Sequence, residues 1–254
     1  MNYDFSPERL SIALDMLKND MPYALWETLY ATVLATLFAV IIGLPLGILL
    51  AVGGKDGIIR VPKWVLSLLG VLINLLRSVP FIILMVIVIP LTRLIVGTSI
   101  GTEASIVPLV IAAFPFVARL VESSIREVNP NIIEAAQSMG ASPFQIIAKV
   151  LIPECVPSLI SNLTIAFTTI LGYTALASAA GGGGLGALAI TKGLNVRKFD
   201  IMYSASLSNT VESVRIAVYP SHNPLLLGFE TRLFLKFRNR EGNVHKDASR
   251  SESQ

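Results

Sequence analysis

Few side chains in this sequence have the types and spacing that catalysis requires. The only cysteine is Cys155, and both histidines, His222 and His245, lie beyond residue 207. A serine or cysteine nucleophile normally needs a base nearby, and no histidine lies in the apolar part of the chain. The glycine-rich run 181–186 does not belong to a phosphate-binding Gly-x-x-x-x-Gly-Lys-Ser/Thr loop. The sequence therefore predicts no enzyme, no metal site and no cofactor bound by this chain.

The most informative pattern lies in the segment 129–153. Asn129 can cap a helix that Pro130 begins, and Gly140 can end that helix in a left-handed turn. The dipeptide Ser142-Pro143 repeats the cap and start signals, and apolar residues follow at helical spacing until the proline that closes the segment. This pattern predicts two short helices that meet at a bend and do not span a membrane.

Such a helix pair can enter a groove on a partner protein. Ala135 and Ala136 are small enough to allow a partner to come close, Gly140 permits the bend, and Glu134 can form a charge-assisted contact. A plain connection between two helices is an alternative interpretation. A helix-turn-helix DNA reader is another, but Lys149 is the only basic residue of the segment, whereas DNA contact requires several.

The rest of the chain has the composition of a membrane protein. It is 53% hydrophobic and 15% charged, with a mean hydropathy of +0.68, whereas ordinary soluble domains are about 25% charged. No charged residue occurs at 28–54 or 155–191, and each run exceeds the roughly 20 residues that cross a hydrocarbon core. We predict an all-α integral membrane protein, a polytopic helical bundle with four clear spans. They are 25–52, 64–96, 105–121 and 156–180. The net charge of +3 gives no reason to expect a nucleic-acid partner.

The second span is too long for one straight crossing. At about 1.5 Å per residue it would reach about 50 Å as one helix, beyond a hydrocarbon core of about 30 Å. Pro80 disfavours helical geometry at the residue before it, so we expect a kink there. Arg77 is costly inside a membrane unless it faces protein, water or the interface. Arg77, Ser78 and Pro80 are therefore candidates for a kink or for a pathway through the membrane.

Basic residues in short loops favour the cytoplasmic side of a membrane. The loop 53–63 has three of them and the loop 93–104 has one, which places the N-terminus outside. The loop 181–200, also with three basic residues, argues for the opposite orientation.

Before the first span, residues 1–24 have apolar positions at helical spacing and predict an amphipathic interfacial segment.

The segment 129–153 resembles the coupling motif of bacterial ABC importer permeases. The resemblance rests on Glu-Ala-Ala, then a glycine, then an apolar run that ends at a proline. At the end of this run, the family more often shows Ile-x-Leu-Pro. It implies that the segment docks on a cytoplasmic ATPase subunit and transmits its opening and closing to the spans. The residues that it assigns to this contact are Glu134, Ala135, Ala136, Gly140, Ser142, Pro143, Val150, Ile152 and Pro153.

Further motifs look like those of the methionine-uptake branch of these type I, binding-protein-dependent permeases. They lie at 77–84, 89–101, 172–173 and 181–186, and the likeness covers about 26–207. It implies five spans, a homodimer in a bacterial inner membrane and an external methionine-binding lipoprotein. It also implies two ATPase subunits that hold ATP and magnesium. By this resemblance, 25–207 is the transmembrane permease domain, and 64–96 is one long bent span.

The C-terminal part departs from the family. A fifth span is expected from about Ile201, but polar and charged residues interrupt it from Ser208 onward. The sequence predicts a degraded fifth span and an atypical, poorly ordered polar tail at 208–254, such as a frameshift or an altered stop would leave. An ABC permease for another small solute and an ion-coupled secondary transporter remain as alternative functions. Proton relays usually place ionisable residues inside spans, and the first and fourth spans have none, although sodium bound by backbone carbonyls would need none.

Overall fold

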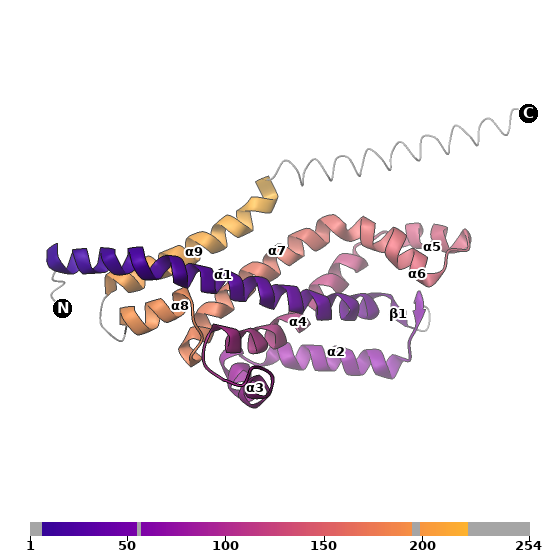
Figure 1. Cartoon of the computed structure of the whole chain (residues 1–254). Coiled ribbons are helices and arrows are strands. Elements are labelled where there is room, and N and C mark those ends of the chain that lie inside the picture. Colours follow the sequence, from indigo (N-terminus) through magenta and orange to yellow (C-terminus); the bar gives the residue numbers. More distant parts are fainter. Residues whose placement is uncertain (1–6, 55–56, 195–198, 223–254) are drawn as a thin grey trace, which may run out of the picture.

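The computed structural model describes residues 7–54, 57–194 and 199–222, and these residues form a helical bundle (Figure 1). The α-helices are α1 (Pro7–Val52), α2 (Lys63–Ser78), α3 (Phe81–Val96), α4 (Thr102–Arg126), α5 (Pro130–Ser138), α6 (Pro143–Ile146), α7 (Ile152–Ala177), α8 (Leu185–Ala187) and α9 (Phe199–His222). Short helical turns of other types are η1 (Ile147–Leu151), η2 (Ser178–Ala180) and η3 (Leu188–Leu194). Two residue pairs join β1 (Gly53–Gly54) to β2 (Ile59–Arg60) in parallel.

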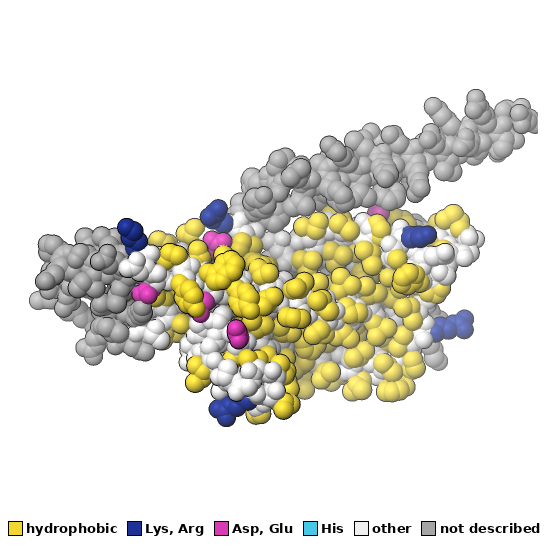
Figure 2. Space-filling view, in the orientation of Figure 1, with side chains coloured by type: hydrophobic (Ala, Val, Ile, Leu, Met, Phe, Trp, Pro, Cys, Tyr) yellow, Lys and Arg dark blue, Asp and Glu magenta, His cyan; other side chains and the backbone are white. Residues whose placement is uncertain are grey.

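Three helical stretches of the described chain are long and apolar enough to cross a membrane. They are Lys18–Val52, Thr102–Arg126 and Pro143–Ala180, and the bent pair α2–α3 would make a fourth crossing. Hydrophobic side chains cover the middle of the molecule, and most coloured charged side chains lie toward its two ends (Figure 2). The predicted all-α, polytopic membrane fold is therefore confirmed. Helix α9 does not meet the same length and composition test over its described residues.

Helix α1 runs without interruption from Pro7 to Val52. No helix boundary therefore separates the predicted interfacial segment 1–24 from the span 25–52, within the residues from 7 onward that are described. The helix makes its most extensive contact with α4. A Cβ atom on Gly43 would lie 2.9 Å from the carbonyl oxygen of Phe114, and one on Gly47 would lie 2.6 Å from Cβ of Val121. These two glycines let the helix backbones approach closely, as small residues do in membrane bundles.

Helices α2 and α3 are bent by 111° relative to each other at a short break. The break contains Val79, whose backbone is extended with φ −78° and ψ 126°, and Pro80, with φ −56° and ψ 136°. The ring of Pro80 disfavours a helical conformation at Val79, and this explains why the helix stops one residue earlier. The bend lies where the sequence analysis expects a kink.

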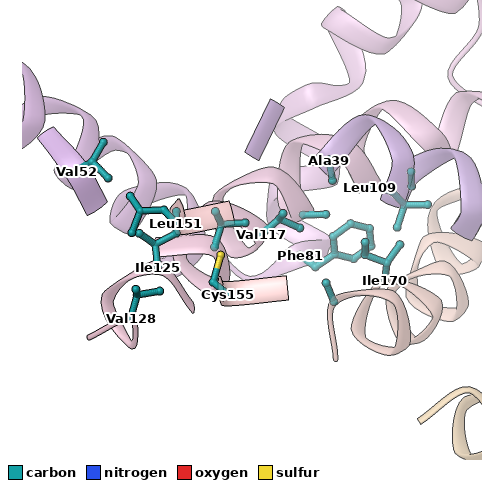
Figure 3. Close-up of a cluster of buried hydrophobic side chains, with 14 of the residues drawn as sticks. Ala39, Val52, Phe81, Leu109, Val117, Ile125, Val128, Leu151, Cys155 and Ile170 are labelled. Carbon is teal, nitrogen blue, oxygen red and sulfur yellow. The ribbon is translucent and has the colours of Figure 1, made fainter. Parts of the chain in front are cut away.

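The core joins α1, α3, α4 and α7. Figure 3 shows its side chains as one continuous cluster, from Val52 and Leu151 at one end to Leu109 and Ile170 at the other. The ring of Phe81 on α3 stacks on that of Tyr173 on α7, with centroids 4.8 Å apart and planes 2° from parallel. Because lipid tails are as apolar as these side chains, close van der Waals packing, rather than removal from water, holds such helices together.

The helix that begins at Pro143 does not end at Pro153. One helical stretch continues from α6 through η1 and α7 to Ala180. The N–H of Ile152 bonds to the carbonyl of Ile147, five residues back, which is the pattern of a π-helical turn. Proline removes a donor and crowds the preceding turn of a regular helix, and this wider turn directly before Pro153 accommodates it. The sequence-based end of the second short helix is thus corrected.

Helix α9 continues past Leu207 to His222. The first residues of the predicted tail 208–254 are therefore helical, and 223–254 lie outside the described residues. Two hydroxyl groups in this part bond back to helix carbonyls, Thr210 to Ser206 and Ser213 to Asn209, each at 2.9 Å. Such bonds make polar side chains compatible with a helix, so the polar composition after 207 does not end it.

Candidate coupling site

The turn between α4 and α7 is built by two helix caps. The side chain of Asn129 accepts a hydrogen bond from the N–H of Asn131 at 3.0 Å, and Pro130 follows as the first residue of α5. Gly140 then takes the left-handed conformation, with φ +75°. These features agree with the expected start and end of the first short helix.

The second cap is a reciprocal capping box. The N–H of Ser142 donates to Oε1 of Gln145 at 2.9 Å, and the N–H of Gln145 donates to Oγ of Ser142 at 3.4 Å. The sequence analysis identified Ser142 and Pro143 but missed Gln145. The Ser-x-x-Gln spacing is typical of a capping box, and it could have identified Gln145.

The predicted Glu-Ala-Ala residues do not share one environment. Glu134 and Ala135 are exposed, whereas Ala136 is 4% exposed and packs into the core of its own chain. The carbonyl of Ala136 also accepts a bond from the N–H of Ala141 at 3.1 Å. The small side chain of Ala136 therefore permits close packing within this chain and not close approach to a partner, which corrects the expectation for this residue.

Two large apolar side chains project from the turn. Met139 is 81% exposed and Phe144 is 78% exposed, and they lie on either side of Gly140 in the sequence. We call the exposed surface formed by Glu134, Ala135, Met139, Gly140 and Phe144 the coupling knob. Contiguous exposed apolar surface marks contacts with proteins or membranes, and these two side chains are the candidates for such a contact on this turn. The sequence analysis did not select Met139 or Phe144, although apolar residues beside a predicted turn were a usable signal.

The residues after the knob fix it to the bundle. Ile146 and Leu151 are almost completely buried, with exposures of 1% and 0%. Val150, Ile152 and Pro153, which the motif comparison selects, are half-buried. These three residues therefore serve more to position the knob than to form its exposed surface.

An ionic network lies at the end of α4 that leads to the knob. The carboxylate of Glu122, which is 8% exposed, lies 2.6 Å from Nη1 of Arg119 and 2.9 Å from Nη2 of Arg126. Arg119 also donates to Oδ1 of Asn74 on α2 at 2.9 Å, and Arg126 to the carbonyl of Leu50 on α1 at 3.4 Å. The network thus ties α4 to α2 and to α1.

The sequence analysis ended the third span at Val121 and missed this network. The signal that could have found it was the presence of opposite charges at helical i, i+3 and i+4 spacings, which place Arg119, Glu122 and Arg126 on one face.

Polar bonds also connect the end of α4 to α7. Oγ of Ser158 donates to Oε2 of Glu127 at 2.7 Å, and Asn162 donates to Ser124 at 2.8 Å. The two helices that flank the knob are therefore linked directly.

The predicted kink residues lie apart from the knob. The α2–α3 bend lies at the lower edge of the molecule in Figure 1, about halfway along its length, whereas α5 and α6 lie at one end, near β1. The guanidinium of exposed Arg77 lies 5.9 Å from the ring centroid of Phe116 on α4, within the range of a cation–π contact. The hydroxyl of Ser78 bonds to the carbonyl of Asn74 at 2.8 Å and closes the last turn of α2.

The other end of the molecule is held by a second set of polar contacts, which we call the Glu27 clasp. The carboxylate of Glu27 accepts bonds from the N–H of Gly184 and the hydroxyl of Thr102, both at 2.9 Å. The hydroxyl of Thr28 accepts from the N–H of Leu185 at the same distance. Gly184 has φ +85°, and a Cβ on Gly183 would collide with Thr102. The glycine run is thus a tight loop, as expected, and it packs on α1 and α4.

The described residues thus form a bundle of apolar helices that are long enough to cross a membrane, with a knob at one end. Residues 43–211 match the family model of the binding-protein-dependent transport system inner membrane component. This chain belongs to that family, and it is a multi-pass protein of the inner membrane.

Relatives with described functions support the assignment at high identity. The chain is 49% identical over 183 residues to the probable D-methionine transport system permease protein MetI of Vibrio cholerae serotype O1, covering 72% of this chain and 80% of that protein. It is 46% identical over 152 residues to the D-methionine transport system permease protein MetI of Escherichia coli K12, covering 60% and 70%. The predicted family of importer permeases is therefore confirmed.

Solved structures agree with the fold. A native crystal form of inward facing conformations of the MetNI methionine ABC transporter superposes with a TM-score of 0.77 at 39% identity, over 82% of this chain and 95% of that one. An amino acid ABC transporter with histidines gives a TM-score of 0.68 at 23% identity, over 91% and 100%, and shares the fold. The predicted separation between this membrane component and ATP hydrolysis by another subunit is confirmed by the family.

Proposed function

We propose that this chain is the membrane permease of an ATP-driven importer whose substrate is methionine. The observation that carries the proposal is 49% identity over 183 residues to a permease described as serving D-methionine transport. The similarity to the methionine transporter structure, with a TM-score of 0.77 at 39% identity, agrees with it. Import of another small solute is the second candidate, because the chain's own residues do not define the chemistry of the substrate.

The permease acts as a homodimer with two ATPase subunits and an external substrate-binding lipoprotein. ATP and magnesium are held by the ATPase subunits and not by this chain. Membership of the binding-protein-dependent family and the similarity to the MetNI methionine ABC transporter support this arrangement. In this arrangement the permease supplies the pathway, and its partners supply energy and substrate.

The coupling knob is the contact with the ATPase subunit. Met139 and Phe144 enter an apolar groove of that subunit, and Glu134 forms a charge-assisted bond beside them. Ala135 and Gly140 have small side chains or none, so they allow the ATPase subunit to approach closely. The capping box of Ser142 and the buried residues after it hold the coupling knob in its conformation. Motion of the ATPase then moves α4 and α7 together, because Ser158 and Asn162 join them.

The N-terminus lies outside the cell. The knob has to face the cytoplasm, where ATP is, and α1 begins at the opposite end of the molecule in Figure 1. Arg60 and Lys63 follow α1 near the knob, and Lys149 lies on the same segment as the knob. This concentration of positive charge supports a cytoplasmic location for that end.

Transport by reconstituted complexes tests this proposal. The permease is co-purified with its ATPase subunit, placed in proteoliposomes and supplied with the binding protein and radiolabelled methionine. Uptake is expected only with ATP present, and excess unlabelled methionine should abolish it. Uptake that persists without ATP when a membrane potential is imposed would instead support the ion-coupled transporter. Competition by a different solute, with no effect of methionine, would support the second candidate.

A further inference from the structure

A cavity of about 420 Å³ lies between the N-terminal half of α1 and the residues that lead into α4. Helix α1 contributes three aromatic side chains, Tyr23, Trp26 and Tyr30, which are 66%, 66% and 39% exposed. Their spacing of three and four residues places them on one helix face. Glu27 and Glu103 add two carboxylates to the lining. Figure 2 shows acidic side chains among hydrophobic ones over this part of α1.

The lining favours an organic cation. Aromatic faces attract ammonium and guanidinium groups, and carboxylates form short charge-assisted bonds with them. The described residues that line the cavity include two carboxylates and no basic side chain. A phospholipid headgroup would bring its phosphate close to Glu27 and Glu103, and the repulsion between like charges disfavours this occupant. Tyrosine and tryptophan are also common at membrane interfaces, so a lipid is the alternative occupant that a test has to distinguish.

The cavity shares a carboxylate with the Glu27 clasp. Both oxygens of Glu27 are already used, by the N–H of Gly184 and the hydroxyl of Thr102. The N–H of Gly101, which is also in the cavity lining, donates to the carbonyl of Gly181 at 2.8 Å. A cation that binds Glu27 therefore shares the carboxylate with the bonds that hold the glycine loop against α1 and α4, and it weakens them by drawing on the same negative charge.

We propose that this cavity receives a lysine or arginine side chain of the external substrate-binding protein, and that this contact loosens the Glu27 clasp. The inference rests on the importer function and on the orientation proposed above, which place the cavity on the side where that protein docks. The occupant is inferred from charge complementarity, because the two carboxylates of the cavity lining attract a cationic side chain. The glycine loop then connects docking to the start of α8 and the end of α7.

Docking affinity tests the inference. The complex of permease and ATPase subunits is placed in lipid nanodiscs, and binding of the purified cognate binding protein is measured by interferometry. Glu103→Gln removes one charge from an exposed position and is expected to weaken docking about tenfold, and Trp26→Leu to a similar extent. Glu154→Gln, an exposed carboxylate near the knob end, is the matched control and should leave docking affinity unchanged. Ethylguanidinium chloride should inhibit docking more strongly than sodium chloride at equal ionic strength.

Two outcomes would overturn the inference. Docking of Glu103→Gln and Trp26→Leu with wild-type affinity, by complexes that elute normally from a sizing column, would show that no cation of the partner occupies the cavity. A stability difference between wild type and Glu103→Gln that depends on phosphatidylethanolamine content, with unchanged docking, would assign the cavity to lipid. In both cases ATP-dependent uptake by the wild-type complex would leave the proposed function standing, whereas its absence would contradict that function separately.

Discussion

The carboxylate of Glu122 bridges Arg119 and Arg126, three residues before it and four after it on the same helix. The bridge is part of a larger connection, because Arg119 reaches α2 and Arg126 reaches the end of α1. The end of α4 that leads to the coupling knob is therefore tied to two neighbouring helices through one acidic side chain.

Replacing Glu122 by glutamine should destabilise this connection. The variant leaves two arginines close together without the charge that compensates them, and a loss of about 2 kcal/mol is expected for a largely buried charged group. Thermal unfolding of the detergent-solubilised complex measures it. Arg126→Gln is the comparison, because the Arg126 side chain is 62% exposed and should have a clearly smaller effect. Equal stability of Glu122→Gln and wild type would contradict a stabilising role.

Gly47→Ala should weaken the packing of α1 on α4. The added methyl group would lie 2.6 Å from Cβ of Val121, so the helices would have to separate, at a cost of about 1–3 kcal/mol. Gly172→Ala is the matched control, since a Cβ there meets no atom within 4 Å in this chain. The yield and melting temperature of the purified complex should fall for Gly47→Ala only. A similar fall for both variants would show that the helix contact is not the cause.

Gly140→Val should distort the knob, because a β-branched residue at φ +75° costs roughly 1–2 kcal/mol or more. Gly140→Asn should be better tolerated, since asparagine enters the left-handed region more easily than other side chains. The measured quantity is the amount of ATPase subunit that co-purifies with the permease. If valine and asparagine have the same effect, backbone conformation is not what position 140 requires.

Phe144→Asp should reduce ATPase association at least tenfold while the permease itself remains folded. The ring is 78% exposed, so its removal leaves no cavity in this chain, but a carboxylate cannot enter an apolar groove without a large desolvation cost. Asn131→Asp, exposed at the start of the neighbouring short helix α5, is the control for added charge. Association is measured by pull-down and by ATPase activity stimulated in the complex. Normal association of Phe144→Asp would remove this ring from the proposed interface.

Membrane character and the turn at Gly140 could be predicted from the sequence, because they depend on long uncharged runs and on local cap chemistry. The bend at Pro80 followed from the geometry of a single residue type. Contacts between distant parts of the chain could not be predicted in this way. Ala135 and Ala136 are the same residue type, yet only the second is buried, because burial depends on how α5 lies against η1. The bonds of Glu27 likewise join residues that are far apart in the chain.

The predicted helix end at Pro153 was wrong for a different reason. A proline ends a regular helix more often than it continues one, and the sequence contains no clear sign that a wider turn precedes it. The polar residues after Leu207 led to the expectation of an interrupted helix. Serine and threonine side chains can, however, bond to carbonyls of their own helix, which continues here.

The unbroken helical stretch from Pro143 to Ala180 has a mechanical consequence. Its 38 residues would extend about 57 Å at the usual rise per residue, and it joins the knob to the glycine loop at the opposite end. Under the proposed function, this stretch acts as a lever across the bilayer, with one end at the contact with the ATPase subunit and the other beside the Glu27 clasp. The regular hydrogen bonding of this stretch is interrupted at the wide turn 147–151 and at Pro157 inside α7, and both lie in the half next to the knob.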